Sequence, residues 1–138
     1  MQNKTKLWVA VVQAAPVIME LDKTVQKALN LIKAAGEKKV DLIVFPEAFL
    51  PAYPRGLTFG FTVGNRTMEG RLDWQRYYKN SIKVPGDVTK ILGEAAKEAG
   101  VYLSMGVIER DAAETNHTLY CTNLFWSSDG VLLGNTVN

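Results

Sequence analysis

Cysteine and histidine are nearly absent from this chain, since its 138 residues contain one of each, Cys121 and His117. A single thiol cannot form an intramolecular disulfide, which favours a reducing compartment, and we expect the cytoplasm. One imidazole without partner cysteines or histidines cannot build a zinc site, so we expect no metal and place His117 in a solvated loop. The spaced glycines of "RGLTFGFTVGNR" match neither a P-loop nor a G-x-G-x-x-G motif, and no cofactor is predicted.

Long apolar runs and an excess of one charge are also lacking. No apolar stretch approaches the ~18 residues that a transmembrane helix needs. The 16 Lys and Arg residues stand against 14 Asp and Glu, the net charge is +2, and the basic residues are spread along the sequence. This pattern predicts neither a membrane nor a nucleic-acid partner. With 47% hydrophobic residues, the chain is typical of one globular domain with an apolar core.

The first 45 residues predict a strand, a helix and a second strand. Residues 7–12, "LWVAVV", are continuously apolar, which is typical of a strand covered on both faces of a sheet. The same run imitates a signal peptide, but its shortness and Gln13 favour the strand. Residues 22–39 carry one apolar stripe at helical spacing, and residues 41–45, "DLIVF", are a short apolar strand. A strand–helix–strand unit of this kind makes the two strands parallel.

The remaining residues predict a mixed α/β sheet. Prolines, glycines and aromatic residues fill positions 48–70, and an irregular segment of this length is usually functional. Helices are expected over 72–82 and 87–99 on one side of the sheet, with Asp87 as N-cap and Gly100 ending the second helix. Strands are expected over 101–110 and 118–127, and Asp129-Gly130 predicts a hairpin into 131–134.

Glu47 is the candidate for chemistry. It follows the second strand directly, where open α/β sheets place their ligands, and Pro46 turns the chain away from that strand. With Phe45 and Phe49 on either side, we expect a partly desolvated carboxylate, as a general base requires. The alternative is that Glu47 caps a turn or pairs with Arg55.

Cys121 and the aromatic residues of helix 72–82 each allow two interpretations. A Glu–Cys pair would suit attack on a carbon–nitrogen bond, but Cys121 lies in mid-strand, where a small buried thiol is common, so a structural role is favoured. Trp74, Tyr77 and Tyr78 could form a partner surface, although a packed amphipathic face is the more frequent outcome. From the residues alone, no reaction can be named.

Five blocks in order resemble the N-terminal portion of a nitrilase, in the carbon–nitrogen hydrolase superfamily. They are "VAVVQAAPV", "DLIVFPEAFLPAYPRG", "IKVPGD", "GVIERD" and "TLYCTNLFWSSDGVLLG", and together they span nearly the whole chain. The resemblance implies that residues 1–138 form the N-terminal half of one carbon–nitrogen hydrolase domain, part of a truncated αββα sandwich.

The resemblance also implies a Glu–Lys–Cys catalytic set and a nitrile substrate. In that family the cysteine attacks the nitrile carbon, the glutamate is the general base, and the lysine stabilises charge before water releases ammonia and a carboxylic acid. Glu47 matches the family's glutamate, and Tyr53 matches a position in the wall of the substrate pocket. Cys121 falls outside the family's cysteine motif, and the expected lysine and cysteine segments do not follow "LLG".

We therefore expect an N-terminal nitrilase part that is inactive alone. Three alternatives stay open: a residual activity through Glu47 and Cys121, a non-catalytic interaction fragment that docks on a full-length homologue, and an amidase of the same superfamily. Association into a homo-oligomer or with such a homologue is expected, because half a sandwich leaves a sheet uncovered and makes folding marginal or aggregation-prone.

Overall fold

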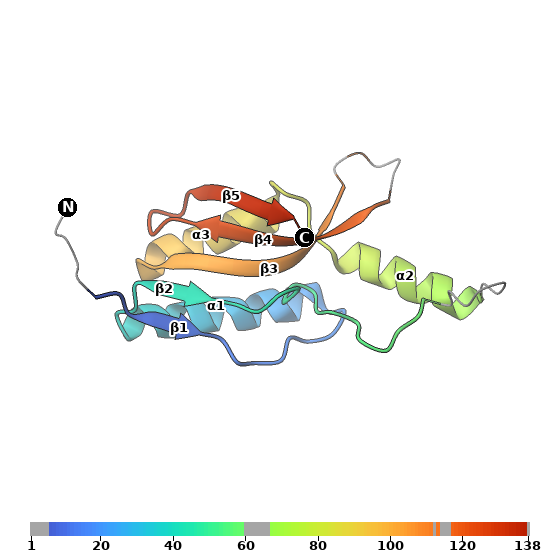
Figure 1. Cartoon of the computed structure of the whole chain (residues 1–138), viewed down its shortest axis with the longest axis horizontal. Coiled ribbons are helices and arrows are strands. Elements are labelled where there is room, and N and C mark those ends of the chain that lie inside the picture. Colours follow the sequence, from blue (N-terminus) through green and yellow to red (C-terminus); the bar gives the residue numbers. More distant parts are fainter. Residues whose placement is uncertain (1–5, 60–66, 112, 114–116, 138) are drawn as a thin grey trace.

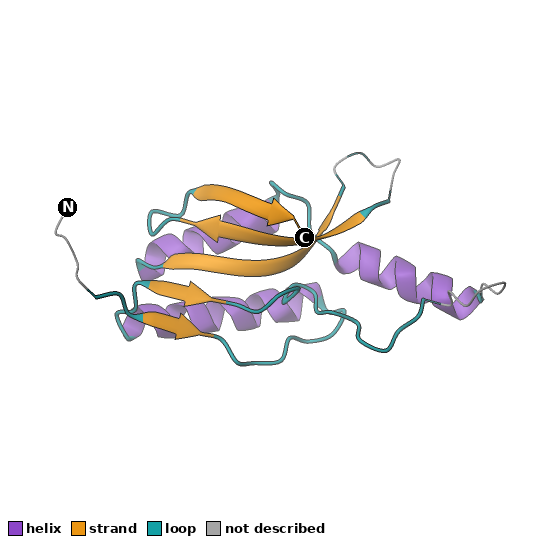
Figure 2. Ribbon diagram, in the orientation of Figure 1, coloured by secondary structure: helices purple, strands orange, loops and turns teal. Residues whose placement is uncertain are grey.

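The computed structural model shows a five-stranded sheet with helices on one face (Figures 1 and 2). It describes residues 6–59, 67–111, 113 and 117–137. The mixed α/β class predicted from the sequence is confirmed. The strands lie across the sheet in chain order and are β1 (Val9–Val11), β2 (Leu42–Val44), β3 (Tyr102–Arg110), β4 (Leu119–Trp126) and β5 (Leu132–Val137). The helices are α1 (Leu21–Glu37), α2 (Met68–Asn80) and α3 (Asp87–Ala99).

The strand directions agree with the sequence pattern. β1 pairs with β2 in parallel and β2 with β3 in parallel, as the strand–helix–strand order predicted. β3, β4 and β5 follow as antiparallel neighbours. The turn between β4 and β5 contains Asp129-Gly130, and Gly130 adopts a left-handed φ of 82°. β5 runs to Val137, three residues beyond its predicted end at Gly134.

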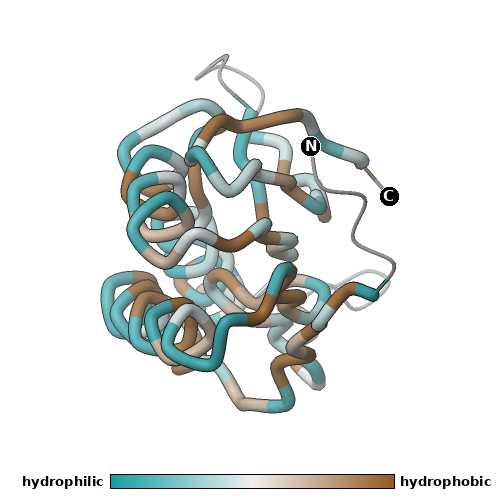
Figure 3. The backbone as a smooth tube through the Cα atoms, turned by 90° about the vertical axis from the view of Figure 1, so that its left-hand side faces the viewer, coloured by the Kyte–Doolittle hydropathy of each residue, from teal (hydrophilic) through white to brown (hydrophobic). Residues whose placement is uncertain are grey.

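The core lies between the sheet and a helix layer made of α1 and α3. Seen end on in Figure 3, the two helices form one layer and the strands another. The helices contact each other where Gly36 faces Ala99, because a Cβ at Gly36 would lie 2.9 Å from the Ala99 Cβ. The inner face of the sheet is fully buried against these helices through Leu103, Met105 and Leu124.

The opposite face of the sheet carries exposed apolar side chains. Val9 and Val11 of β1 are 49% and 76% exposed, and Tyr102 of β3 is 49% exposed. The prediction that the first strand is covered on both faces is therefore wrong for this chain, because α1 and α3 lie on the other face and β1 is an edge strand. The uncovered sheet expected from the resemblance agrees with these exposures.

The two helices on the sheet are not the predicted pair. α2 starts at Met68, earlier than predicted, with its N-terminus capped by the Thr67 side chain. It extends beyond the end of the sheet (Figure 1). Its apolar face is too narrow to cover a sheet, since Leu72 is 59% exposed and Tyr77 is the one large apolar residue that it buries. α1 takes the place beside α3 instead.

The start of α3 differs by one residue from the prediction. Gly86, not Asp87, occupies the N-cap position, and Asp87 lies in the first turn, where its charge favours the helix dipole. The Thr89 hydroxyl accepts a hydrogen bond from the Gly86 N–H at 2.9 Å and so fixes this turn. Gly100 ends the helix in the left-handed conformation, with φ 67°, as predicted.

Arg110 at the end of β3 holds the C-terminus of α2. Its Nη1 donates to the carbonyl oxygens of Tyr78 at 3.3 Å and Ser81 at 2.9 Å, and its guanidinium lies 5.9 Å from the centre of the Tyr78 ring. Because a cation at a helix C-terminus compensates exposed carbonyls, Arg110→Ala should lower the free energy of unfolding by about 1–2 kcal/mol. Urea unfolding checks this, with Arg110→Lys as the charge-preserving control. Equal midpoints for wild type and Arg110→Ala would contradict it.

Candidate active site at the carboxyl end of strand β2

Glu47 lies on a segment that passes over β3 immediately after β2 ends. The Phe45 N–H donates to the Ser104 carbonyl at 2.9 Å, and the Ile108 N–H donates to the Leu50 carbonyl at 2.7 Å. Between these anchors the chain crosses Gly106. A Cβ at Gly106 would lie 2.6 Å from the Glu47 Cα and 2.7 Å from the Ala48 N, so glycine is what permits this crossing. The strand end predicted for Glu47 is where the structure places it.

Cys121 of β4 lies beside the Glu47 carboxylate. Its Sγ donates to Glu47 Oε1 at 3.1 Å, across 74 residues of sequence. In the β3–β4 ladder Cys121 is the partner of Ile108, and Asn123 is the partner of Gly106. Residues directly opposite in a ladder point to the same face, so Cys121 and Asn123 lie on the face that Glu47 crosses.

A small cavity joins these groups. Its volume is about 200 Å³, and it is lined by Val44, Phe45, Glu47, Ser104, Gly106, Cys121, Thr122 and Asn123. Ser104 Oγ donates to Asn123 Oδ1 at 3.2 Å, which gives the cavity a polar wall. The volume is below the roughly 300 Å³ at which small-molecule pockets usually begin. These residues therefore form part of a binding site rather than an enclosed pocket.

The predicted desolvation of Glu47 is wrong, because its side chain is exposed. Phe45 and Phe49 turn away from it into the core, where they are 4% and 1% exposed and their ring centres lie 5.0 Å apart. Both alternatives for Glu47 also fail within the described residues, where its carboxylate caps no turn and makes no ion pair with Arg55. The Cys121 thiol is its hydrogen-bond partner there.

The mid-strand position of Cys121 is confirmed, but the side chain is half-buried rather than buried. Burial, together with the hydrogen bond to Glu47 and the negative charge of that carboxylate, raises the pKa of the Cys121 thiol to about 11. The thiol is therefore protonated at neutral pH and serves as a donor. A thiolate nucleophile would need the opposite shift.

The raised pKa of Cys121 predicts an alkaline loss of stability. In the unfolded chain the thiol loses its proton near its ordinary value of 9, whereas the folded chain keeps the proton until about 11. The folded state therefore binds more protons between these values, and its stability falls as the pH rises through this window. Urea midpoints measured from pH 8 to 11 should fall less steeply in Cys121→Ser, and identical slopes would contradict the expectation.

Tyr53 lies in the loop after Glu47 and is 67% exposed. It does not line the cavity beside Glu47. Tyr53 lies close enough to Tyr77 of α2 to affect its ionisation. Tyr77 is 6% exposed, and its hydroxyl pKa is raised by burial and by the proximity of Cys121 and Tyr53. Tyr53 and Cys121 therefore both lie near Tyr77 of α2.

The other sequence-predicted candidates take structural places. His117 is exposed in its loop and packs edge-on against Tyr78 at 5.3 Å. Trp74 and Tyr77 pack with Phe59, so the packed interpretation holds for them. Gly60 and Gly64 lie outside the described residues. No group of three potential metal ligands occurs in the described part of the chain, and none of its helices is long and apolar enough to cross a membrane.

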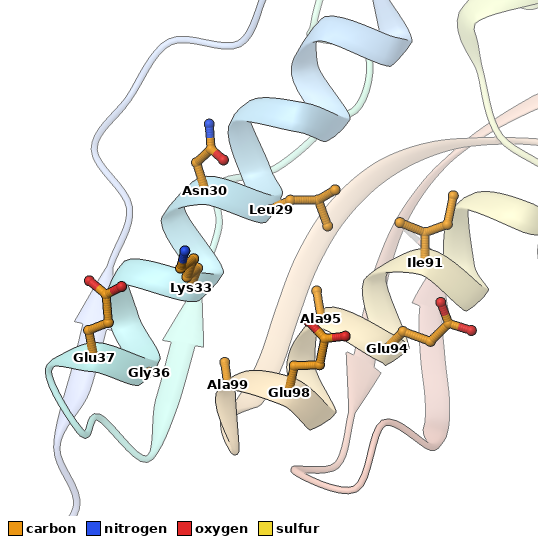
Figure 4. A pocket seen from close by; sticks show the side chains of 10 residues that line it. All are labelled: Leu29, Asn30, Lys33, Gly36, Glu37, Ile91, Glu94, Ala95, Glu98 and Ala99. Atoms are coloured by element: carbon orange, nitrogen blue, oxygen red, sulfur yellow. The ribbon is translucent and has the colours of Figure 1, made fainter.

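A larger groove of about 690 Å³ lies between α1 and α3 (Figure 4). Leu29 and Ile91 face each other across it, and the carboxylates of Glu94 and Glu98 lie on its rim. Lys33 and Glu37 of α1 also line the groove, and all four charged residues are exposed on the helix surfaces. The smaller cavity beside Glu47 is the better candidate for chemistry.

Sequence reasoning missed Gly106 and the two polar residues that complete this cavity, Ser104 and Asn123. Alternation along each strand does place Ser104 and Gly106 on one face of β3, and Cys121 and Asn123 on one face of β4. That signal was available. It does not tell which face meets Glu47, because the register between the strands is not local information.

Comparison with known proteins gives one family for this arrangement. Residues 8–136 match the carbon–nitrogen hydrolase family. An aliphatic nitrilase of Sinorhizobium fredii (strain HH103) is 47% identical over 127 residues, which are 92% of this chain and 40% of that protein. A bifunctional nitrilase/nitrile hydratase of Nicotiana tabacum, NIT4B, is 45% identical over 90% of this chain and 34% of its own length. This chain therefore spans about two fifths or less of these relatives.

Solved structures agree on the fold. The NitFhit protein of Caenorhabditis elegans superimposes with a TM-score of 0.70 at 22% identity, over 96% of this chain and 27% of that one. An N-terminal amidase in complex with an Asn-Glu-Ala peptide gives 0.67 at 20% identity, over 96% of this chain and 28% of that one. Because 129 of the 138 residues, positions 8 to 136, match one family, the chain belongs to the carbon–nitrogen hydrolases.

Proposed function

We propose that this chain supplies the general base and part of the substrate cavity of a nitrilase, as the N-terminal part of one hydrolase domain. The observation that carries the proposal is the position of Glu47 at the end of β2, beside a cavity, in a chain 47% identical to an aliphatic nitrilase. Nitrile hydrolysis consumes two waters and gives a carboxylic acid and ammonia.

The proposed role of Glu47 follows from its exposed carboxylate. A thiol nucleophile must lose its proton as its sulfur attacks the nitrile carbon, and a carboxylate within hydrogen-bond reach can accept that proton. The resulting thioimidate takes up water and releases ammonia, which leaves a thioester that a second water hydrolyses to the acid. Glu47 also serves to activate these waters. Tyr53 is proposed as a wall of the substrate site on the side nearest α2.

We infer that the nucleophile is not Cys121. It falls outside the cysteine motif that the resemblance implies, and its pKa near 11 leaves very little thiolate at neutral pH. The nucleophilic cysteine and the lysine of the Glu–Lys–Cys set are proposed to come from outside these residues. Purified chain 1–138 should then release no ammonia from phenylacetonitrile or benzonitrile. Release that disappears in Cys121→Ser would overturn this inference.

A chimaeric enzyme tests the function itself. Residues 8–136 replace the matching segment of the Sinorhizobium fredii nitrilase, and ammonia release is measured with a nitrile and with the corresponding amide. We expect nitrile hydrolysis within about tenfold of the parent enzyme, and faster than amide hydrolysis. A folded chimaera that hydrolyses only the amide would support the amidase alternative. This alternative is less favoured, because the similar amidase structures are below 25% identity and indicate the fold alone.

An interaction fragment is the second candidate function, and the apolar sheet face favours it. Val11 at 76% and Leu133 at 61% exposure belong to strands at the two edges of the sheet. We propose that this face associates with a second copy of the chain or with a full-length homologue in the cytoplasm. Light scattering over a concentration series tests this, alone and with the Sinorhizobium nitrilase. A chain that stays monomeric in both cases would exclude it.

A further inference from the structure

The backbone at Glu47 is held in place, whereas its side chain is not packed. Backbone hydrogen bonds to β3 fix the segment on both sides of it, at Phe45 and at Leu50. The side chain itself is exposed, so packing does not select its rotamer. Among the described residues, the Cys121 thiol is the group that bonds its carboxylate, at 3.1 Å.

We propose that Cys121 is a positioning residue for Glu47, because its thiol holds one carboxylate oxygen and so limits the orientations that the other can take. This inference rests on the proposed function of Glu47 as the general base. It assigns a role to a residue that lies outside the cysteine motif of the resembling family.

The strand that carries Cys121 is suited to hold another side chain still. Cys121 pairs with Ile108 of β3, and from the next residue, Thr122, β4 is paired with β5 as well. A residue in such a position has a fixed Cα–Cβ direction, and the thiol has one torsion left to set before it reaches the carboxylate. A long charged side chain would have to lose more rotamer freedom to do the same.

The chemistry of a thiol also suits the task. At neutral pH the thiol is protonated, since burial and Glu47 raise its pKa to about 11. A neutral, weak donor orients a carboxylate without supplying a positive charge that would compete for it. Oε1 accepts from the thiol, so Oε2 stays free to take up a proton from a nucleophile or a water.

Alkylation of Cys121 in chain 1–138 reports the contact directly. The rate with iodoacetamide, followed by mass spectrometry at low micromolar protein from pH 7 to 11, measures the thiolate fraction. In the described part of the chain, the ionisable groups that face the thiol are Glu47 and Tyr77. In Glu47→Gln the charge is gone, and the rate at pH 8 should increase about three- to tenfold. Glu109→Gln is the matched control, because its carboxylate bonds Thr122, on the opposite face of β4.

The rotamers of Glu47 provide the second readout. Three-bond NMR couplings across its χ1 and χ2 should report one rotamer in wild type and averaged rotamers in Cys121→Ala. Cys121→Ser retains a hydroxyl donor and should restore the single rotamer. Far-UV circular dichroism verifies that the variants are folded.

Two results would overturn the positioning role. One is an alkylation profile of Glu47→Gln that equals both wild type and Glu109→Gln. The other is a single Glu47 rotamer that persists in Cys121→Ala. Failure of the proposed function gives a different pattern: the thiol and carboxylate remain coupled, which supports the contact, while the chimaeric enzyme hydrolyses no nitrile.

Discussion

Replacement of Glu47 by Gln in the chimaeric enzyme should lower kcat for nitrile hydrolysis about a thousandfold and change KM little. A general base contributes roughly 10²–10⁴ to the rate, because it removes a proton in the transition state only. The amide has nearly the shape of the carboxyl group and can still accept the Cys121 hydrogen bond at its oxygen, so the loss is one of basicity. Initial rates of ammonia release over a substrate series separate kcat from KM.

Glu109→Gln is the control for charge. This substitution also removes one negative charge, from a β3 residue adjacent to Ile108. The Glu109 carboxylate accepts a hydrogen bond from Thr122 at 2.8 Å. Its kcat should stay within about threefold of the unmutated chimaera. If Glu47→Gln retained more than about a tenth of kcat, Glu47 would not be the base, since this is less than general-base catalysis supplies.

Gly106→Ala should have the second large effect, on both stability and the site. The added methyl group would meet the backbone of the Glu47 segment, 2.6 Å from Glu47 Cα and 2.7 Å from Ala48 N, and backbone cannot rotate away as a side chain does. Overpacking of this kind costs about 1–3 kcal/mol of unfolding free energy. Displacement of the segment by about 1 Å should also lower kcat of the chimaera about a hundredfold.

Gly134→Ala is the matched control, because Gly134 lies on β5 of the same sheet and a Cβ there would meet nothing within 4 Å. Urea unfolding of chain 1–138 measures the effect on stability, and the alkylation rate of Cys121 measures the displacement of the Glu47 carboxylate. In Gly106→Ala that rate should rise, as in Glu47→Gln, since the carboxylate has moved off the thiol. Gly106→Ala and Gly134→Ala with equal midpoints and equal rates would show that the crossing at Gly106 has no such role.

The fold was largely readable from the sequence because its signals are local. Apolar periodicity gave α1 and α3, the strand–helix–strand order gave the parallel pairs, and Asp129-Gly130 gave the hairpin. The wrong predictions concern burial and packing, which a local sequence pattern does not determine. The apolar run of β1 predicted burial on both faces, yet an edge strand with helices on one side leaves Val9 and Val11 exposed. α2 buries only one large apolar residue, Tyr77, so it is α1 that packs beside α3 on the sheet.

By itself, the sequence determined that this is an α/β chain of the carbon–nitrogen hydrolase kind with a carboxylate, Glu47, at the end of its second strand. The tertiary structure alone decided what surrounds that carboxylate. Phe45 and Phe49 turn into the core and leave it exposed, Gly106 lets its backbone cross β3, and Cys121, 74 residues away, donates to it. The physical reason is that strand ends and periodicity follow from neighbours in sequence, whereas register and close approach depend on how separate strands pack.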